Sequence, residues 1–271
     1  MTRIEYAMIV RGRTRLEALV ERINTRSQTR AYLERNGGDL SDHEREHEAF
    51  HSALDHVQRE LTDLLKYKMV DRSFLPAFIF SHDQLVITIG QDGLLANAAK
   101  YVGGLPVIGV NPDPERYDGV LWPYTSGTCR PAVESVLAGS YVTRSASLAE
   151  AAPNDGQRLL AFNDLFIDVD DHTSARYNIA YEGAEEERSS SGILVSTGSG
   201  STGWLSSVHN MANGLLGNGG KVQHKHQPLS EDELQFVVRE PFLSQRTGIS
   251  VFDGAVVDAC YRGDLLGRHC R

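Results

Sequence analysis

The segment Leu85–Gly93, with the sequence LVITIGQDG, constrains the fold more than any other part of this chain. Its first five residues are apolar apart from one threonine, which is typical of a strand buried on both faces of a parallel sheet. Ligands of open α/β sheets bind beyond the carboxyl ends of such strands. Gly90 and Gly93, which follow the strand, let a backbone approach a ligand closely, and Asp92 adds a carboxylate. The segment therefore predicts a parallel α/β sheet with a ligand site at its carboxyl edge.

The residues around this strand predict further elements of an α/β domain. A capping box at Thr14–Glu17 opens a helix that is expected to run to Arg35, and a second box at Ser41–Glu44 opens a helix through about residue 65. Strand, turn, helix and strand in this order are typical of a βαβ unit. The other elements expected here are strands at 6–10 and 106–110 and a helix at 94–102.

Beyond Trp122-Pro123 the sequence changes to short apolar runs separated by turns, such as Asn154-Asp155-Gly156. This texture is typical of an all-β domain. We therefore predict a Rossmann-like α/β domain with a parallel sheet over residues 1–125, followed by a β-rich, sandwich-like domain over 126–271. The elements expected after the boundary are a helix at 130–137, strands at 159–162, 165–169, 176–181, 192–196 and 234–238, and a loop at 215–228.

A second glycine-rich segment follows the predicted strand at 192–196. Its sequence from Gly198 to Gly203, GSGSTG, matches the dinucleotide pattern G-x-G-x-x-G. That pattern requires a helix next, whereas glycines interrupt residues 210–220, so a polar loop between strands is favoured over a Rossmann site. A P-loop is also disfavoured, because no lysine follows a glycine-rich turn at the required spacing. Together with the turn at 90–93, the segment suggests a nucleotide site with one acidic group at its centre.

Two acidic positions each have two interpretations. Asp92 either caps the helix that follows it, or serves as a general base or metal-adjacent carboxylate beside bound phosphates. Asn163-Asp164, between two apolar runs, either forms a bulge or turn or offers an amide and a carboxylate to a ligand. The residues alone leave these alternatives open.

Histidines at His43, His47 and His51 share one helix face, and the first two match the pattern H-E-x-x-H. The segment is saturated with charge, so a solvated helix face is favoured over a zinc site. The pair His224 and His226 is better explained as part of a loop. We therefore assign no metal ligand.

The chain of 271 residues carries a formal net charge of −9, which disfavours a general nucleic-acid binder, because phosphate backbones require a basic surface. Three widely spaced cysteines indicate a reduced protein without a disulfide framework. The start of the sequence lacks a secretory apolar core, and no apolar run approaches the ~20 residues of a membrane span. We expect a soluble, cytoplasmic protein with no membrane or nucleic-acid partner.

Taken in order, the motifs resemble those of the NAD kinases, which use ATP to phosphorylate the adenosine-ribose 2′-hydroxyl of NAD. The family's Gly-Gly-Asp-Gly turn is similar to Gly90–Gly93, its Asn-Glu pair to Asn163-Asp164, and its Ser/Thr-rich run to Ser196–Trp204. The segments Val107–Arg116 and Ser190–Gly192 are most similar to the subgroup that includes the mitochondrial NAD kinases. The likeness extends from about residue 84 to residue 242.

The resemblance implies an α/β domain followed by a β-sandwich-like domain, and in-line phosphoryl transfer in which Asp92 accepts the proton of the ribose hydroxyl. It implies ATP, Mg²⁺ and NAD as substrates or cofactors, small-molecule nucleotides as partners, and a homodimer or homotetramer. Use of NADH in place of NAD, or of polyphosphate in place of ATP, stays open. The residues that it assigns to nucleotide binding are Gly90, Gly93, Asn111, Asn163, Asp164, Thr202, Gly203, Trp204 and Ser207.

Two other functions stay open. Lipid and sphingoid kinases of a related group use a similar turn, although Asn163-Asp164 and Ser196–Trp204 disfavour them. A non-catalytic NAD-binding regulator is the second alternative. It is suggested by Gln91, which replaces a glycine of the family's turn, and by the end of the sequence at Arg271, where family members usually continue with further strands.

Overall fold

The structure is a computed structural model that describes residues 4–117, 119, 121–153, 155–217, 222, 226–256 and the backbone of 262–263. The chain forms two compact units, Met1–Thr143 and Arg144–Arg271. The predicted boundary after residue 125 falls inside the first unit, because helix α5 (Cys129–Leu137) packs against the sheet of that unit. Val133 of this helix shares an apolar cluster with Leu85 of the sheet.

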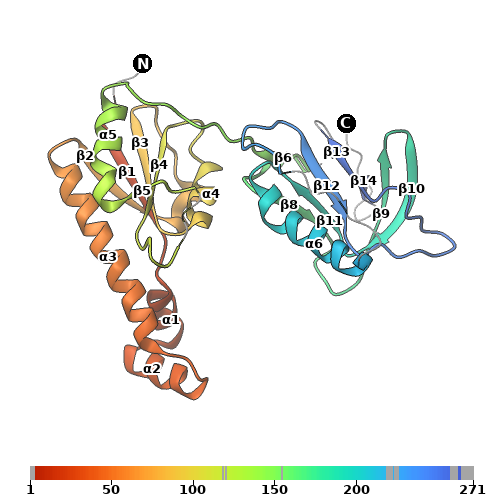
Figure 1. The fold of residues 1–271 in the computed structure, drawn as a ribbon, viewed down its shortest axis with the longest axis horizontal. Helices are drawn as coiled ribbons and strands as arrows, with labels where there is room; N and C mark the ends of the chain where they lie inside the picture. The colour runs from red at the N-terminus through yellow and green to blue at the C-terminus, as the bar shows by residue number, and fades with distance from the viewer. Residues whose placement is uncertain are drawn as a thin grey trace. The chain divides into compact units, whose positions relative to one another are not determined.

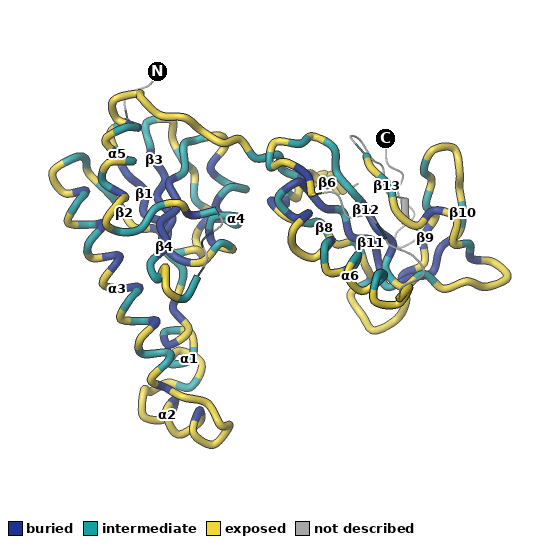
Figure 2. Tube along the Cα trace, in the orientation of Figure 1, coloured by how far each residue is buried: buried dark blue, intermediate teal, exposed yellow. Residues whose placement is uncertain are grey.

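A five-stranded parallel sheet forms the centre of the first unit and confirms the predicted α/β class. Its strand order is β2-β1-β3-β4-β5 (Figure 1). Figure 2 shows that buried residues follow the central strands, as expected where helices cover both faces of a sheet. The strands are β1 (Tyr6–Arg11), β2 (Lys66–Asp71), β3 (Gln84–Ile89), β4 (Val107–Asn111) and β5 (Tyr124–Thr125).

Helical segments cover the sheet on both faces. On one face, Val57 of α3 and residues of α5 pack against Ile87. On the other face, Leu94 of α4 and Leu75 of the 3-10 helix η1 pack against Val86. The bounds are α3 (Leu40–Thr62), η1 (Arg72–Ala77), α4 (Asp92–Ala99) and η2 (Ser126–Thr128). Helix α4 therefore ends three residues before residue 102, where the sequence predicted its end.

The predicted helix that the capping box at Thr14–Glu17 opens and that runs to Arg35 is two helices, α1 (Arg15–Ile23) and α2 (Arg26–Arg35). Asn24 ends α1 with a φ of 80°, a left-handed conformation that stops a helix. The side chain of Thr25 then caps α2 by accepting the backbone N–H of Gln28. The single-helix prediction was wrong because the apolar spacing continues across this break.

The long helix α3 begins at Leu40, and its N-cap is Asp39, which accepts the backbone N–H of Ser41. The predicted capping box at 41–44 is therefore wrong. Figure 1 shows α1 and α2 beside the N-terminal part of α3. A small apolar cluster that includes Leu16, Leu33 and Leu40 joins the three helices.

Antiparallel sheets form the second unit and confirm the prediction of a β-rich half. Their strand orders are β13-β12-β11-β8, β10-β9-β14 and β6-β7. Tyr177 of β9 shares an apolar cluster with Ile193 of β11 and Phe236 of β12. The sandwich-like arrangement of the sheets stays a prediction. The strands are β6 (Ala149–Ala151), β7 (Leu159–Ala161), β8 (Asp164–Ile167), β9 (Ala175–Tyr181), β10 (Ala184–Ser190), β11 (Ile193–Ser196), β12 (Leu234–Val238), β13 (Asp253–Val256) and β14 (Arg262–Gly263).

Helix α6 (Trp204–Leu216) follows the short 3-10 helix η3 (Gly200–Thr202), so the expectation of an interrupted segment after residue 210 was wrong. Leu205 holds this helix against Leu194 and Val237 of the four-stranded sheet. The Rossmann interpretation stays disfavoured, because β11 pairs only with antiparallel neighbours. Most of the predicted loop at 215–228 lies outside the described residues. Within the described ranges, no helix combines the length and the apolar composition of a membrane span.

Candidate functional site

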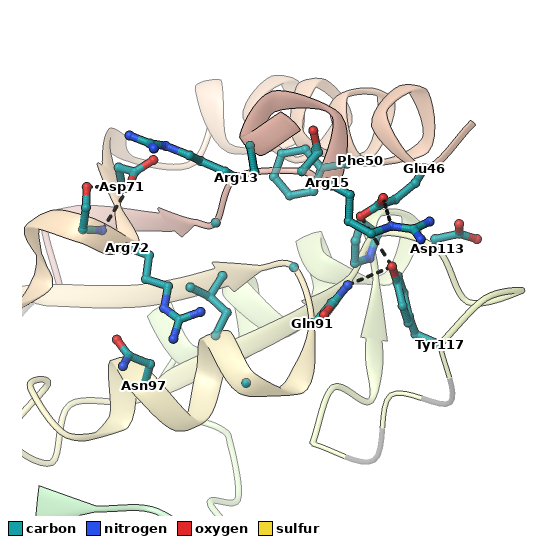
Figure 3. Close-up of a pocket in the computed structure, with 18 of the residues that line it drawn as sticks. Arg13, Arg15, Glu46, Phe50, Asp71, Arg72, Gln91, Asn97, Asp113 and Tyr117 are labelled. Carbon is teal, nitrogen blue, oxygen red and sulfur yellow. Dashed lines mark hydrogen bonds and ion pairs between the residues drawn. The ribbon is translucent and has the colours of Figure 1, made fainter. Parts of the chain in front are cut away.

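A cavity of about 640 Å³ lies at the carboxyl edge of the parallel sheet (Figure 3). In the order 2-1-3-4-5 the winding of the chain reverses between β1 and β3, and open α/β sheets bind ligands at this switch point. The segments that follow four strands line the cavity, namely 12–15 after β1, 71–73 after β2, 90–91 after β3 and 112–113 after β4. The cavity thus lies where the strand at 85–89 and its turn predicted a ligand site.

The turn after β3 presents backbone to the cavity. Gly90 has a φ of +154°, and a Cβ added there would lie 3.0 Å from Cδ2 of Leu94. A Cβ added at Gly93 would meet no atom within 4 Å in the described part of the protein, so packing does not require glycine at this position. Gln91 is exposed, and its Nε2 donates to the hydroxyl of Tyr117 at 2.9 Å (Figure 3).

Asp92 is the first residue of α4, and Gln91 is the N-cap, so the interpretation of Asp92 as the cap is wrong. Oδ1 of the half-buried Asp92 accepts a hydrogen bond from the backbone N–H of Leu121 at 3.2 Å. The described residues that line the cavity include its neighbours Gln91 and Gly93 but not Asp92 itself. The carboxylate is therefore anchored to the backbone of Leu121, at the positive end of the α4 dipole, and the residues on either side of Asp92 in the sequence line the cavity.

Three arginines that sequence analysis missed also line the cavity. Arg13 pairs with a glutamate of α1, and Arg15 donates to Glu46 of α3 at 2.5 Å. Arg72 is exposed and has no ion pair within the described ranges, and Figure 3 shows its guanidinium directed toward α4 near Asn97. No motif marks these cations, and Arg72 follows a strand that was not predicted.

Ion pairs hold one wall of the cavity together. Arg116 and Arg15 bind Asp42 of α3 at 2.6 and 2.9 Å, and they hold the pKa of that carboxyl far below its usual range. The hydroxyl of Tyr117 lies 3.5 Å from Oε1 of Glu46, and burial together with this negative charge raises the pKa of Tyr117. The contacts join α1, α3 and the loop after β4.

Asn111, which the resemblance assigns to nucleotide binding, is buried at the end of β4. Its Nδ2 donates to the carbonyl of Tyr117 at 2.8 Å, and its Oδ1 accepts the backbone N–H of Asp113 at 3.0 Å. The side chain thus shapes the loop that lines the cavity, and its predicted contact with a ligand stays a prediction.

In the second unit, strand pairing brings together the two motifs predicted there. Strands β8 and β11 are antiparallel, with Asp164 opposite Ser196. The next residue, Thr197, donates its backbone N–H to the carbonyl of Asn163 at 2.9 Å and its hydroxyl to the carbonyl of Phe162 at 2.6 Å. The glycine-rich loop and the Asn163-Asp164 pair therefore form one cluster.

Close packing in this cluster explains why residue 200 is a glycine and why the pKa of the Asp164 carboxyl is raised. A Cβ added at Gly200 would lie 2.3 Å from the carbonyl oxygen of Asn163 and 2.5 Å from Oδ1 of Asp164. Oδ1 is buried and has no hydrogen-bond partner among the described residues. Burial raises the pKa of Asp164, and the nearby hydroxyl of Ser196 offsets part of this effect. Such a carboxyl can accept a hydrogen bond from a ligand or hold a proton more readily than an exposed aspartate.

An aromatic and cationic surface adjoins the loop. Trp204 is 39% exposed, and its ring centroid lies 5.0 Å from that of Phe166. The guanidinium of Arg239 lies over both rings, at 5.3 Å from Trp204 and 5.5 Å from Phe166. Phe166 and Arg239 could not be predicted from the sequence, because three separate segments supply this surface. The other residues predicted for binding here, Thr202, Gly203 and Ser207, are exposed, and the hydroxyl of Ser207 donates to the carbonyl of Gly203.

The predicted site residues fall into two groups. Gly90, Asp92, Gly93 and Asn111 belong to the first unit, and the remaining residues belong to the second. In the first unit Gly90 and Gly93 line the cavity, and in the second unit Asn163, Asp164 and the start of the glycine-rich loop lie at the β8–β11 pair.

The architecture of a parallel α/β unit followed by antiparallel sheets is similar to that of a solved NADH kinase structure. The structure of yeast NADH kinase complexed with NADH matches 97% of this chain and 78% of its own chain, with a TM-score of 0.51 and 12% identity. At this identity the likeness shows the fold alone.

Curated proteins that are similar to this chain in sequence are named NAD kinases or NADH kinases. An NAD kinase of Geobacter sp. (strain M21) is 28% identical over 169 residues, which is 57% of this chain and 55% of the relative. A probable NADH kinase of Oryza sativa subsp. japonica is 29% identical over 185 residues, or 59% and 53%. The chain spans about half the length of these relatives. No family model matches the chain.

Proposed function

We propose that this protein is an NAD(H) kinase that transfers the γ-phosphoryl group of ATP to the adenosine-ribose 2′-hydroxyl. The observation that carries the proposal is the cavity at the β1/β3 switch point, with a glycine turn, flanking arginines and a helix N-terminus at its edge. The names of the similar curated proteins supply the acceptor.

The donor, MgATP, binds in the cavity of the first unit. The backbone at Gly90 and Gly93 admits the phosphates, and Arg72 offers a guanidinium without an ion pair in the described ranges to their negative charge. Mg²⁺ enters as part of the substrate and neutralises the triphosphate. Most of the rate enhancement then comes from positioning and charge stabilisation.

The acceptor is recognised by the second unit. Asp164, whose Oδ1 has no hydrogen-bond partner among the described residues, and the exposed side chain of Asn163 supply hydrogen-bonding groups for ribose hydroxyls or an amide. Trp204, with Phe166 and Arg239, supplies a flat surface on which a nucleotide base can stack.

Asp92 accepts the proton of the 2′-hydroxyl. A carboxylate is too weak a base to ionise an alcohol beforehand, so the proton moves as the bond between oxygen and phosphorus develops. Its position at the start of α4, between two residues that line the cavity, supports this role.

The variant Asp92→Asn tests the proposal in a coupled assay for NADP formation from ATP, Mg²⁺ and NAD. We expect NAD binding to persist and turnover to fall by about 10²–10⁴-fold, the range of general acid–base catalysis. The control variant Asp55→Asn, at an exposed position of α3, keeps full activity. Unchanged turnover in Asp92→Asn would remove this carboxylate from catalysis.

The same assay separates the alternatives. NADH and polyphosphate, tested in place of NAD and ATP, establish acceptor and donor preference. Phosphorylation of diacylglycerol with no NADP formation would instead indicate a lipid kinase. NAD binding without any transfer would indicate a regulator, in which Gln91 and its bond to Tyr117 have modified the turn.

A further inference from the structure

Three side chains of the first unit meet outside the cavity, between α1 and α3. Glu17 comes from α1, and His47 and His51 come from successive turns of α3. Their potential metal-binding atoms all lie within 4.8 Å of one another, and Nε2 of His51 lies 3.1 Å from Oε1 of Glu17. Within the part of the chain that the structure describes, no other group of three or more histidine, cysteine or acidic side chains is arranged in this way.

The two histidines of this group are not the two histidines of the H-E-x-x-H pattern. His43 of that pattern is turned to the carbonyl of Asp39 and takes no part in the group. His47 instead pairs with His51, and the two ring centroids are 4.3 Å apart. His47 and His51 are half-buried against α1, so the expectation of a solvated face holds for neither of them.

Further contacts orient all three groups. Oε2 of Glu17 is held by the guanidinium of Arg11 and by the backbone N–H of Thr14 at 2.9 Å, which leaves Oε1 facing His51. The hydroxyl of Thr14 lies 2.9 Å from Nδ1 of His47 and fixes the orientation of that ring. Outer hydrogen bonds of this kind to the carboxylate and the imidazole are typical of metal sites.

We propose that Glu17, His47 and His51 bind a zinc ion that links α1 to α3. Two imidazoles and one carboxylate, with a water as the fourth ligand, are a donor set that Zn²⁺ uses in proteins. Neighbouring ligands of tetrahedral zinc are about 3.4 Å apart, given bonds of about 2.0–2.1 Å. The 3.1 Å separation between Glu17 and His51 is already close to this value, so binding requires a small closure of His47.

The position of the ion gives it a structural role next to the cavity. Thr14, which contacts His47, lies in the segment after β1 that lines the cavity. Phe50, another lining residue, packs edge-on against His51 with ring centroids 5.4 Å apart. Zinc at this place holds α1 and the segment after β1 in one arrangement. This role is independent of phosphoryl transfer and of the Mg²⁺ that accompanies ATP.

The test uses the untagged full chain, first stripped of metal with a chelator. Zinc is then titrated in competition with a chromophoric chelator, Co²⁺ absorption reports the coordination geometry, and thermal unfolding is followed with and without zinc. The variants are His47→Gln, His51→Gln and Glu17→Gln. The matched control is His43→Gln, a histidine of the same helix and the same sequence motif that stands outside the group.

We expect about one zinc ion bound per chain and a Tm that rises by about 5 °C when zinc exceeds its Kd by 100-fold. Each of the three variants loses about 100-fold or more in zinc affinity, whereas His43→Gln keeps it. Co²⁺ bound to the wild type gives a tetrahedral or five-coordinate spectrum that the variants lack. The proposal is overturned if the wild type binds no zinc, or if His43→Gln loses affinity while His51→Gln retains it. If a variant fails to fold, zinc binding by the wild-type protein and its Co²⁺ spectrum still test the proposal.

Discussion

Gly93 and Gly200 are glycines for different physical reasons. At Gly200 a Cβ would collide with the Asn163 carbonyl, so the packing of the loop excludes any larger residue. At Gly93 nothing in the described structure opposes a Cβ, and the residue lies in the first turn of α4 at the wall of the cavity. A helix is weakened by glycine, so in the proposed function Gly93 serves the close approach of a ligand.

The variant Gly93→Ala is expected to raise the free energy of unfolding by about 0.5 kcal/mol, because alanine favours the helix. The same variant is expected to weaken ATP binding about 10-fold, since the added methyl group stands where a phosphate approaches. Chemical denaturation and calorimetric titration with ATP measure the two effects. Gly214→Ala in α6, where a Cβ would meet no described atom within 4 Å, serves as the control with unchanged ATP affinity. Full ATP affinity in Gly93→Ala would show that the donor does not contact this turn.

Asp164 predicts a pH dependence of stability. Because burial raises its pKa above the usual value of 3.8, the folded state binds its proton more tightly than the unfolded chain does. Its contribution to stability is therefore complete below pH 3.8 and is lost as the pH rises through the raised pKa of the folded state. We expect Asp164→Asn to gain stability relative to wild type over this window, as measured by denaturation at a series of pH values. A difference in the free energy of unfolding between wild type and Asp164→Asn that does not change with pH would contradict the raised pKa of Asp164. The control is Asp168→Asn, which changes an exposed carboxylate.

At the scale of secondary structure, the apolar runs at β1, β3 and β4 could be recognised from sequence because both faces of these strands are buried. Strand β2 was missed because it lies at the sheet edge and buries one residue fully, Val70. Strand β10 was missed because all of its residues after Ala184 are polar, and its pairing partner in the described structure is β9. Tertiary pairing rather than local pattern defines such strands.

Helix α6 was missed for a related reason. Its glycine at 214 weakens the helix locally, whereas the packing of Leu205 against the four-stranded sheet favours it. We expect Leu205→Ala to lower the free energy of unfolding of the second unit by about 2–5 kcal/mol, as measured by chemical denaturation. The exposed Leu215 of the same helix is the matched control, and Leu215→Ala is expected to cost far less. Equal costs for the two variants would mean that α6 does not cover the sheet.

At the scale of the whole molecule, the sequence motifs predicted the class of both units but not their limits. The change in texture near residue 125 marks the start of shorter elements, whereas α5 still completes the core of the first unit. The turn at 90–93 and the Asn163-Asp164 pair could be proposed as candidate site residues because their residue types carry chemistry, and their roles stay predictions. The arginines of the cavity and the Phe166–Trp204–Arg239 surface could not, because distant segments supply them.

Phosphoryl transfer tests the central claim most directly. ATP labelled at its γ-phosphate is incubated with the intact chain, Mg²⁺ and NAD or NADH, and the position of the label in the product is determined. We expect label on the adenosine-ribose 2′-oxygen, formed at a rate that depends on Asp92. Absence of label from the dinucleotide, under conditions in which both ATP and NAD or NADH are bound, would contradict it.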